Sequence, residues 1–172
     1  MRTYHAIREI NVAEQAKLDR YDRQILELLQ QDAGLSNQDL AERIGLSASP
    51  CSRRIKNLEE RGFIDQRIAL INRKALNLNL VAIVAIRMDR HTPDRFEHFE
   101  QAVAKIDEVI ECFLVTGQDS DYQLKVVVPD MDHYHQVLLK HITTIAGVDG
   151  VHSSFLLRDI IKAKPLPLKY LP

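Results

Sequence analysis

The sequence predicts an α+β protein with an N-terminal winged helix-turn-helix joined to a C-terminal ferredoxin-like βαββαβ domain. Two observations predict this fold class. Residues 40–62 hold two helical patterns that meet at a Gly-Leu-Ser turn, as in a helix-turn-helix. Residues 80–161 alternate strand and helix patterns in the order β-α-β-β-α-β, which is the ferredoxin-like order. We therefore expect an arm over residues 1–17, a helix-turn-helix domain over 18–73 and a ferredoxin-like domain over 74–172.

Two helices are expected before the turn of the motif. A supporting helix begins at Asp19 and ends near Gly34, because apolar side chains recur between them at helical spacing. The first helix of the motif follows Ser36, which with Asp39 resembles a capping box. It ends at Gly45, which supplies the positive φ that the end of a helix requires.

The second helix of the motif combines an apolar stripe with a basic face. Ser47 or Ser49 can cap this helix, and Pro50 suits its first turn, where a missing N–H is no loss. The apolar stripe runs from Cys51 to Leu58 at i, i+4 and i+7. The other side carries groups that can hydrogen-bond base edges and phosphates of double-stranded DNA. The predicted DNA contacts are Ser47, Ser49, Pro50, Ser52, Arg53, Arg54, Lys56, Asn57 and, from the next segment, Arg67.

Residues 63–72 follow this helix and alternate imperfectly between apolar and polar side chains. We interpret them as a β-ribbon or wing, from which Arg67 can reach a neighbouring phosphate. A solvated Arg67 in a linking strand fits the same pattern equally well.

Charge is distributed unevenly along the chain. The net charge is only −1, which by itself does not indicate a nucleic-acid-binding protein. Residues 47–74, however, hold seven basic and three acidic side chains, a local charge of +4, whereas residues 75–172 hold ten basic and thirteen acidic ones, or −3. A basic segment beside an acidic domain is typical of a protein with one module on DNA and another held off it.

The C-terminal domain is predicted from its own sequence of elements. Its two helices are marked by Thr92-Pro93 and by Asp130, and the second helix is expected to close at Gly147. The four expected strands are Leu80–Ile86, Val109–Thr116, Tyr122–Val128 and Val151–Ile161, with the middle two forming a hairpin. In Leu80–Ile86 both alternating sets of side chains are apolar, so the sheet face without helices cannot be fully polar. We therefore expect self-association into a dimer.

Cysteine usage and hydropathy indicate a cytoplasmic protein with no membrane partner. Neither Cys51 nor Cys112 has a CxxC partner, so no disulfide framework or zinc site is expected. No run approaches the roughly 18 apolar residues that a membrane helix requires, and the first residues contain no apolar signal-peptide core.

The chain resembles regulators of the Lrp/AsnC family, also called feast/famine regulatory proteins, over residues of about 18–168. The resemblance rests on LDRYDRQILELLQQDAGLSNQDLAERIGLSASPCSRRIKNLEERGFI, on ECFLVTG followed by DY and VVVPDM, and on the tail IKAKPLPL. It implies a winged helix-turn-helix followed by a domain that dimerises, often assembles further, for example into an octamer, and binds amino acids between subunits. It also implies transcriptional control by an amino acid or a related metabolite.

The resemblance places the candidate effector site in the turn between the middle strands. An amino acid needs donors for its carboxylate and an acceptor for its ammonium group, which a Gly-containing turn and Asp121 can supply, while the ring of Tyr122 can close one side. The candidate residues are Gly117, Gln118, Asp119, Ser120, Asp121 and Tyr122. The family usually has two residues between the Gly and the Asp-Tyr pair, and this chain has three. An ordinary hairpin turn is the alternative interpretation, because Gly and Asp are favoured in turns for backbone reasons alone.

Catalysis is not expected. His133 and His135 are two residues apart on a predicted helix and do not share the face that a metal pair requires. The chain has no nucleophile-elbow, phosphate-loop or HExxH motif. We expect no cofactor apart from a possible amino-acid effector. A ligand-independent DNA-binding regulator or architectural protein, and a ligand-binding protein without DNA contact, are the alternatives.

Overall fold

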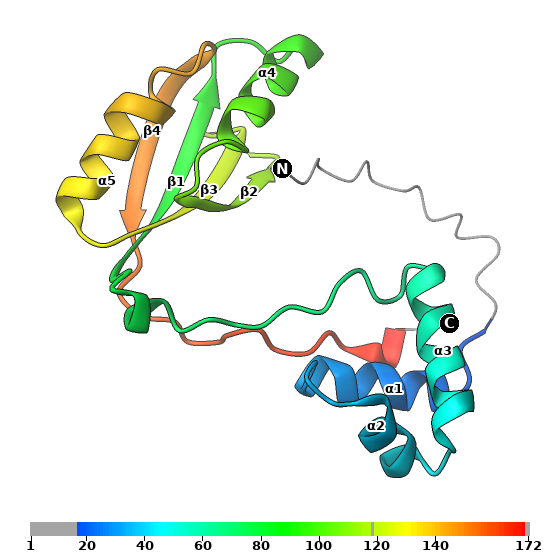
Figure 1. Cartoon of the computed structure of the whole chain (residues 1–172). Coiled ribbons are helices and arrows are strands. Elements are labelled where there is room, and N and C mark those ends of the chain that lie inside the picture. The colour runs from blue at the N-terminus through cyan, green and yellow to red at the C-terminus, as the bar shows by residue number, and fades with distance from the viewer. Residues whose placement is uncertain (1–16, 118, 171–172) are drawn as a thin grey trace. The chain divides into compact units, whose positions relative to one another are not determined.

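The computed structural model describes residues 17–117 and 119–170 (Figure 1). Apart from Lys17, the expected N-terminal arm lies outside the described residues, as does Gln118 of the expected effector turn. The chain forms two compact units. Among the described residues, the first unit takes in the chain up to Leu70 and again from Ile161, and the second is Ile71–Ile160. The tail after Ile160 therefore belongs with the helix-turn-helix, although we expected it in the C-terminal domain.

The first unit contains the three expected helices, α1 (Arg20–Gln31), α2 (Asn37–Ile44) and α3 (Ala48–Glu60). Capping boxes begin α1 and α2, through Asp19 with Asp22 and Ser36 with Asp39 respectively. Gly45 ends α2 with a φ of 71°, in the left-handed region that glycine adopts without strain. Buried apolar residues from this unit form one core, namely Leu18, Ile25, Leu26, Leu29, Leu40, Ala41, Ile44, Cys51, Ile55 and Leu58.

The β-ribbon expected over residues 63–72 is not formed. In the described part of the chain these residues pair with no strand, and residues 64–72 have no regular secondary structure. A ribbon requires a second strand to accept and donate its backbone hydrogen bonds, and the imperfect alternation of this segment supplies neither a partner nor a buried face. Ile68 and Leu70 are accordingly exposed.

The C-terminal tail packs against the first unit. The side chain of Gln30 on α1 brackets Leu166, since its Oε1 accepts the Leu166 N–H at 2.6 Å and its Nε2 donates to the Leu166 carbonyl at 3.4 Å. Leu168 packs against the helical core. The chain thus passes from the first unit to the second after Leu70 and returns after Ile160.

The second unit is a four-stranded antiparallel sheet with two helices, in the predicted βαββαβ order. The strands are β1 (Leu80–Met88), β2 (Val109–Leu114), β3 (Tyr122–Val128) and β4 (Val148–Phe155), arranged β2-β3-β1-β4 (Figure 1). The helices are α4 (Pro93–Val103), which follows the N-cap Thr92, and α5 (Met131–Val137), which a π-helical turn extends over Leu138–Ile142.

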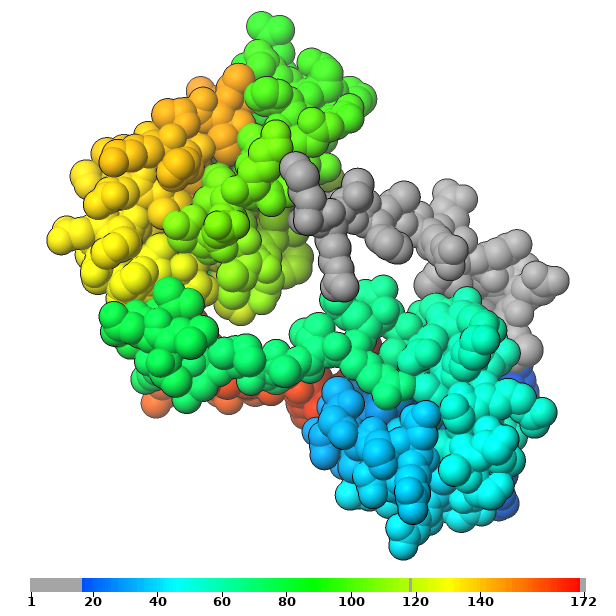
Figure 2. All heavy atoms as spheres, viewed as in Figure 1, coloured from blue at the N-terminus to red at the C-terminus, as the bar shows by residue number. Residues whose placement is uncertain are grey.

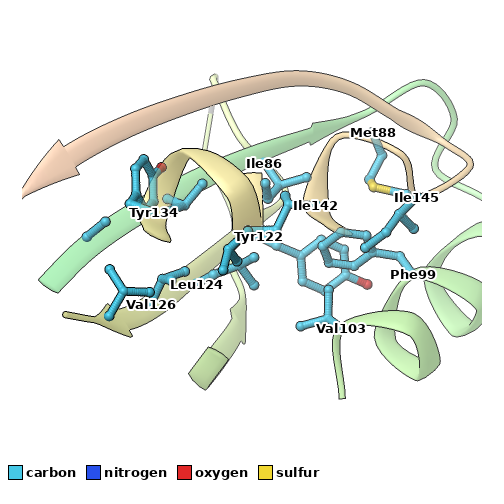
Figure 3. Packing of buried hydrophobic residues seen from close by; sticks show 14 residues of the cluster. Ile86, Met88, Phe99, Val103, Tyr122, Leu124, Val126, Tyr134, Ile142 and Ile145 are labelled. Carbon is cyan, nitrogen blue, oxygen red and sulfur yellow. The ribbon is translucent and has the colours of Figure 1, made fainter. Parts of the chain in front are cut away.

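Alternate residues of the central strands build the core on one face of the sheet (Figure 3). Ile86 of β1 and Tyr122 of β3 are paired in the register, and both side chains are buried. Helix α4 covers this face with Phe99 and Val103, and α5 covers it with Tyr134 and Val137. Both helices therefore lie on the same side of the sheet, as the element order predicts.

The opposite face of the sheet has an apolar centre and a polar rim. Ile83 and Ala85 of β1 are half-buried, and the paired Val81 and Val127 are buried. Towards the edge strand β2, Lys125 binds Glu111 at 2.8 Å, and Phe113 is about half exposed. This face is partly apolar, as expected, with charged groups beside the apolar side chains.

Several element boundaries differ from the prediction, including the ends of β1 at Met88 and of β2 at Leu114, expected at Ile86 and Thr116. Strand β4 begins at Val148 and ends at Phe155, so it starts three residues earlier and ends six residues earlier than expected. The last helix ends with the turn at Ile142, before Gly147, whose φ of 99° belongs to the turn into β4. The Leu156 N–H still donates to the Val81 carbonyl, and among the described residues no later one continues the β1–β4 ladder.

Candidate nucleic-acid interface and effector turn

Helix α3 presents the polar side chains of the predicted DNA face to solvent. Ser47, Ser49, Ser52, Arg53, Lys56 and Asn57 are all exposed, and Pro50 is half-buried in the first turn of the helix. Ser47 is the N-cap residue, but its side chain makes no capping hydrogen bond, so its hydroxyl is not used by the helix. In Figure 2 atoms of α3, coloured cyan, lie on the visible surface of the first unit.

The contacts along this face are few and weak. The Lys56 ammonium lies 3.6 Å from Glu60, and the Lys56 side chain is 76% exposed. Such exposed ion pairs contribute little to stability, so a DNA phosphate can replace the Glu60 carboxylate. Asn57 accepts a hydrogen bond from Arg61 at 3.3 Å, and Ser52 accepts one from Asn37 of α2 at 3.3 Å. Within the described residues Arg53 makes no hydrogen bond or ion pair, which leaves its guanidinium available for a base edge or phosphate.

Arg54 does not lie on this face, contrary to the prediction. Its Nη1 lies 2.8 Å from Asp19 and 2.8 Å from Asp22, which are at the start of α1. The hydrogen bond to Asp22 raises the pKa of the Arg54 guanidinium above its ordinary value. The physical reason is its position, three residues after Cys51 and four before Leu58, on the inner side of the helix.

Arg67 is also occupied within the unit. Its guanidinium lies 2.9 Å from Glu59 in the last turn of α3, and its side chain is 30% exposed. Arg67 must leave Glu59 before it can bind a DNA phosphate. The structure therefore favours the interpretation of Arg67 as part of a linking segment over its interpretation as a phosphate contact from a wing.

Asp121 fastens the effector turn to the end of β1. One carboxylate oxygen accepts the Met88 N–H at 2.7 Å, and the other lies 2.7 Å from Nε2 of His91. The Asp121 N–H donates to the Ile86 carbonyl at 2.7 Å, and its carbonyl accepts the Val115 N–H at 2.8 Å. The His91 side chain is exposed, so the imidazole that contacts this oxygen lies at the surface.

Tyr122 does not close a pocket at this turn, contrary to the expectation. Its ring is buried in the core against Phe99, with ring centroids 4.6 Å apart (Figure 3), and lies 5.6 Å from the ring of Phe96. Its hydroxyl donates to Glu100 at 2.8 Å, and burial, together with that hydrogen bond, raises the pKa of Tyr122. Strand alternation explains the difference: Tyr122 shares a side of β3 with the buried Leu124.

The remaining turn residues lie at the surface. Gly117 and Asp119 are exposed and Ser120 is half-buried, while Gln118 is outside the described residues. A Cβ atom at Gly117 would meet nothing within 4 Å, so space alone does not require glycine there. Sequence reasoning missed His91 as a partner of Asp121, because 30 residues separate them and no local pattern connects them.

Comparison with known proteins identifies the family of the chain. Residues 18–65 match a winged helix-turn-helix DNA-binding model, and residues 81–166 match the Lrp/AsnC ligand binding domain. The leucine-responsive regulatory proteins of Klebsiella pneumoniae and Escherichia coli are each 41% identical to this chain over 152 residues, covering 88% of this chain and 92% of theirs. This chain belongs to the Lrp/AsnC family.

Solved structures of similar proteins share the whole Lrp/AsnC architecture. A transcriptional regulator from Neisseria meningitidis, determined in complex with L-Met, is 38% identical with a TM-score of 0.84, covering 91% of this chain and 100% of its own. An AsnC family transcriptional regulator from Agrobacterium tumefaciens is 38% identical with a TM-score of 0.82, covering 90% of this chain and 100% of its own.

Family membership defines the class of protein. The chain is an Lrp-type transcription regulator with a DNA-binding helix-turn-helix and a ligand-binding domain, and not an enzyme. Among residues 17–117 and 119–170, no helix has both the length and the apolar character of a membrane span. The same residues hold no cluster of three His, Cys, Asp or Glu side chains placed to bind a metal ion.

Proposed function

We propose that this Lrp/AsnC regulator binds operator DNA through the exposed face of α3 and that an amino acid bound to its C-terminal domain changes that binding. The solved Neisseria regulator carries the second half of the proposal, because it was determined with L-Met and matches this chain over nearly its full length. The solvent-exposed basic face of α3 carries the first half.

The proposed base contacts come from the middle of α3. Arg53 and Asn57 can each present two hydrogen-bonding groups to a base edge, and Lys56 can give up Glu60 for a phosphate. The proposed phosphate contacts at the start of α3 are the hydroxyls of Ser47, Ser49 and Ser52. Arg54 is left out of this set, because both acidic partners hold it on the inner side of the helix.

The proposed effector contact is the Asp121 carboxylate. One oxygen is committed to the Met88 N–H and fixes the turn, so only the oxygen now bound to His91 can accept a ligand ammonium. Because His91 is 68% exposed, it can move aside without breaking the packing of the core. Backbone N–H groups of the turn around Gly117 are the proposed donors for the ligand carboxylate. A small α-amino acid is the proposed ligand class, with no other cofactor.

A dimer, with the possibility of larger assemblies, is the proposed active form. The apolar centre of the open sheet face supports this, since a second copy would cover Ile83 and Ala85 and the exposed Phe113. A two-fold dimer presents two α3 helices to a pseudo-palindromic operator. We place this regulator in the cytoplasm, where such operators are found.

The proposed mechanism is a change of assembly. An amino acid that binds one arrangement of the subunits better than another shifts the population toward that arrangement, by no more than its difference in affinity. The spacing of the two α3 helices would change with it, and DNA affinity would follow.

The test begins with thermal shift of the full chain against each of the twenty amino acids, with D-enantiomers as controls. A specific rise in melting temperature is expected from one or a few L-amino acids, because a ligand of the folded state stabilises it. Operator duplexes selected from a random pool are then titrated by fluorescence anisotropy with and without that amino acid. A regulator that binds DNA but responds to no amino acid would favour the ligand-independent alternative.

A further inference from the structure

Arg54 is a charged residue on the buried stripe of the recognition helix. Cys51, Ile55 and Leu58 of α3 are buried, and Arg54 lies between them on the same side of the helix. Its side chain is only 31% exposed. A cation in this position needs partners, because an unpaired charge removed from water is strongly destabilising.

The partners of Arg54 are the two acidic residues of the α1 capping box. Asp19 uses Oδ1 to accept the N–H groups of Tyr21 and Asp22 at 2.8 and 3.0 Å, and its Oδ2 lies 2.8 Å from Arg54. Asp22 uses Oδ2 to accept the Asp19 N–H at 3.3 Å, and its Oδ1 accepts from Arg54 at 2.8 Å. Each carboxylate therefore divides its oxygens between the cap of α1 and the guanidinium from α3.

Two further features make this contact rigid. The Asp22 side chain is only 12% exposed, so the pair is shielded from water and screened less than a surface pair. The guanidinium carbon also lies 5.3 Å from the centre of the Tyr21 ring, within the range of a cation–π contact. Arg54 is thus held by three side chains, Tyr21 and Asp22 at the start of α1 and Asp19 just before it.

We propose that Arg54 is a positioning residue for DNA recognition: it locks α3 against the start of α1 at a fixed rotation and so aims Arg53, Lys56 and Asn57 at the groove without touching DNA. Packed apolar side chains alone allow a helix to slide or roll by a fraction of a turn, whereas charged hydrogen bonds to two fixed carboxylates do not. In some proteins an ion pair shielded from water specifies geometry in this way even where it adds little stability. The inference rests on the proposed α3 face.

The sign of one substitution separates positioning from direct DNA contact. Asp22→Asn removes a negative charge from the DNA-binding unit, which by electrostatics alone should strengthen DNA binding or leave it unchanged. If Asp22 instead holds Arg54 in place, the same substitution weakens binding. Glu42→Gln, which removes an exposed carboxylate from α2, is the matched control for the charge effect.

The experiment uses the full chain and an operator duplex selected from a random pool with the unaltered protein. Asp22→Asn and Arg54→Met are each expected to weaken binding about tenfold or more, the effect of losing one good base contact, while Glu42→Gln does not weaken it. The slope of log affinity against log salt concentration stays unchanged in Arg54→Met. A phosphate contact by Arg54 would instead lower that slope by about 0.9.

A double variant separates positioning from stability. Asp22→Leu combined with Arg54→Met leaves no buried charge unpaired, so the melting temperature is expected to recover toward that of the unaltered chain while DNA affinity does not. Unaltered affinity in the folded double variant would overturn the proposal, and so would tighter binding by Asp22→Asn or a reduced salt slope in Arg54→Met. If either single variant fails to fold, the double variant still makes this comparison.

The proposed DNA face is tested apart from this inference by Arg53→Ala. If Arg53→Ala binds as tightly as the unaltered chain while Asp22→Asn binds weakly, the base contacts assigned to α3 are wrong but the lock between α1 and α3 holds. If Arg53→Ala weakens binding and Asp22→Asn does not, the face is correct and the lock is not needed.

Discussion

Replacing Asp121 with alanine is expected to destabilise the whole C-terminal unit and not only its effector turn. The carboxylate accepts the Met88 N–H at 2.7 Å, and Met88 is buried at the end of the central strand β1. Removing the acceptor leaves that N–H unsatisfied, at a cost of about 1–3 kcal/mol. The contact with the exposed His91 adds only about 0–1 kcal/mol, as is usual for pairs open to water.

The expected change in melting temperature is large enough to measure directly. For a domain of the size of Ile71–Ile160, each 1 kcal/mol lowers the midpoint by about 4–8 °C, so a loss of about 1–3 kcal/mol lowers it by about 4–24 °C. Near-ultraviolet circular dichroism follows the unit through the buried Tyr122 and Tyr134, since the chain contains no tryptophan. Hydrogen exchange at the Met88 amide localises the effect.

Two variants sharpen the Asp121 experiment. Asp121→Asn keeps an oxygen that can accept the Met88 N–H and should lose much less stability than the alanine variant. His91→Ala removes the exposed contact alone and should change the midpoint by less than a third of the Asp121→Ala effect. A midpoint for Asp121→Ala within about 1 °C of the unaltered protein would refute the reasoning, because a buried N–H cannot lose its acceptor at no cost.

Three further predictions follow from single contacts. The hydrogen bond from the His133 backbone N–H, and then the contact with its side chain, lower the pKa of Asp130 below 3.8. The cap therefore stabilises α5 above pH 3.8, and this stabilisation is lost as the pH falls further. Below pH 3.8 the melting temperature of Asp130→Asn should fall less than that of the unaltered chain. Burial, with Glu100 nearby, raises the pKa of Cys112 to about 11, so iodoacetamide should label the native chain at pH 8 far more slowly than the unfolded chain. Leu168→Ala should destabilise the first unit by about 1 kcal/mol, half the burial value of a leucine, and speed hydrogen exchange in α1; unchanged exchange would show that the tail contributes nothing there.

Two adjacent arginines of α3 have different environments in the structure. Arg53 and Arg54 carry the same charge and stand side by side in the sequence, yet one is exposed and the other is held by Asp19 and Asp22. An operator contact map that treats the basic residues of α3 as equivalent would therefore assign to DNA a side chain that binds within the protein.

Local sequence patterns were sufficient for most of the fold. The period of apolar residues and the caps at Asp19, Ser36 and Asp130 placed the helices, since each cap involves residues only two or three positions apart. The hairpin strand Tyr122–Val128 has the bounds predicted for it, and the order of elements gave the ferredoxin-like sheet. Helical phase, applied strictly, would also have placed Arg54 on the inner side of α3, three residues after Cys51.

The remaining features of the fold and of the site depended on contacts between residues far apart in the sequence. No local pattern specifies that Asp19 and Asp22 accept from Arg54, or that His91 lies against Asp121, because each pair joins residues at least 30 positions apart. Residues 63–72 alternate well enough to suggest a strand, but a strand exists only where a second segment satisfies its backbone groups, and tertiary folding supplies none here among the described residues. The sequence by itself determined the elements and the family, whereas tertiary contacts decided which charged side chains remain free to bind DNA.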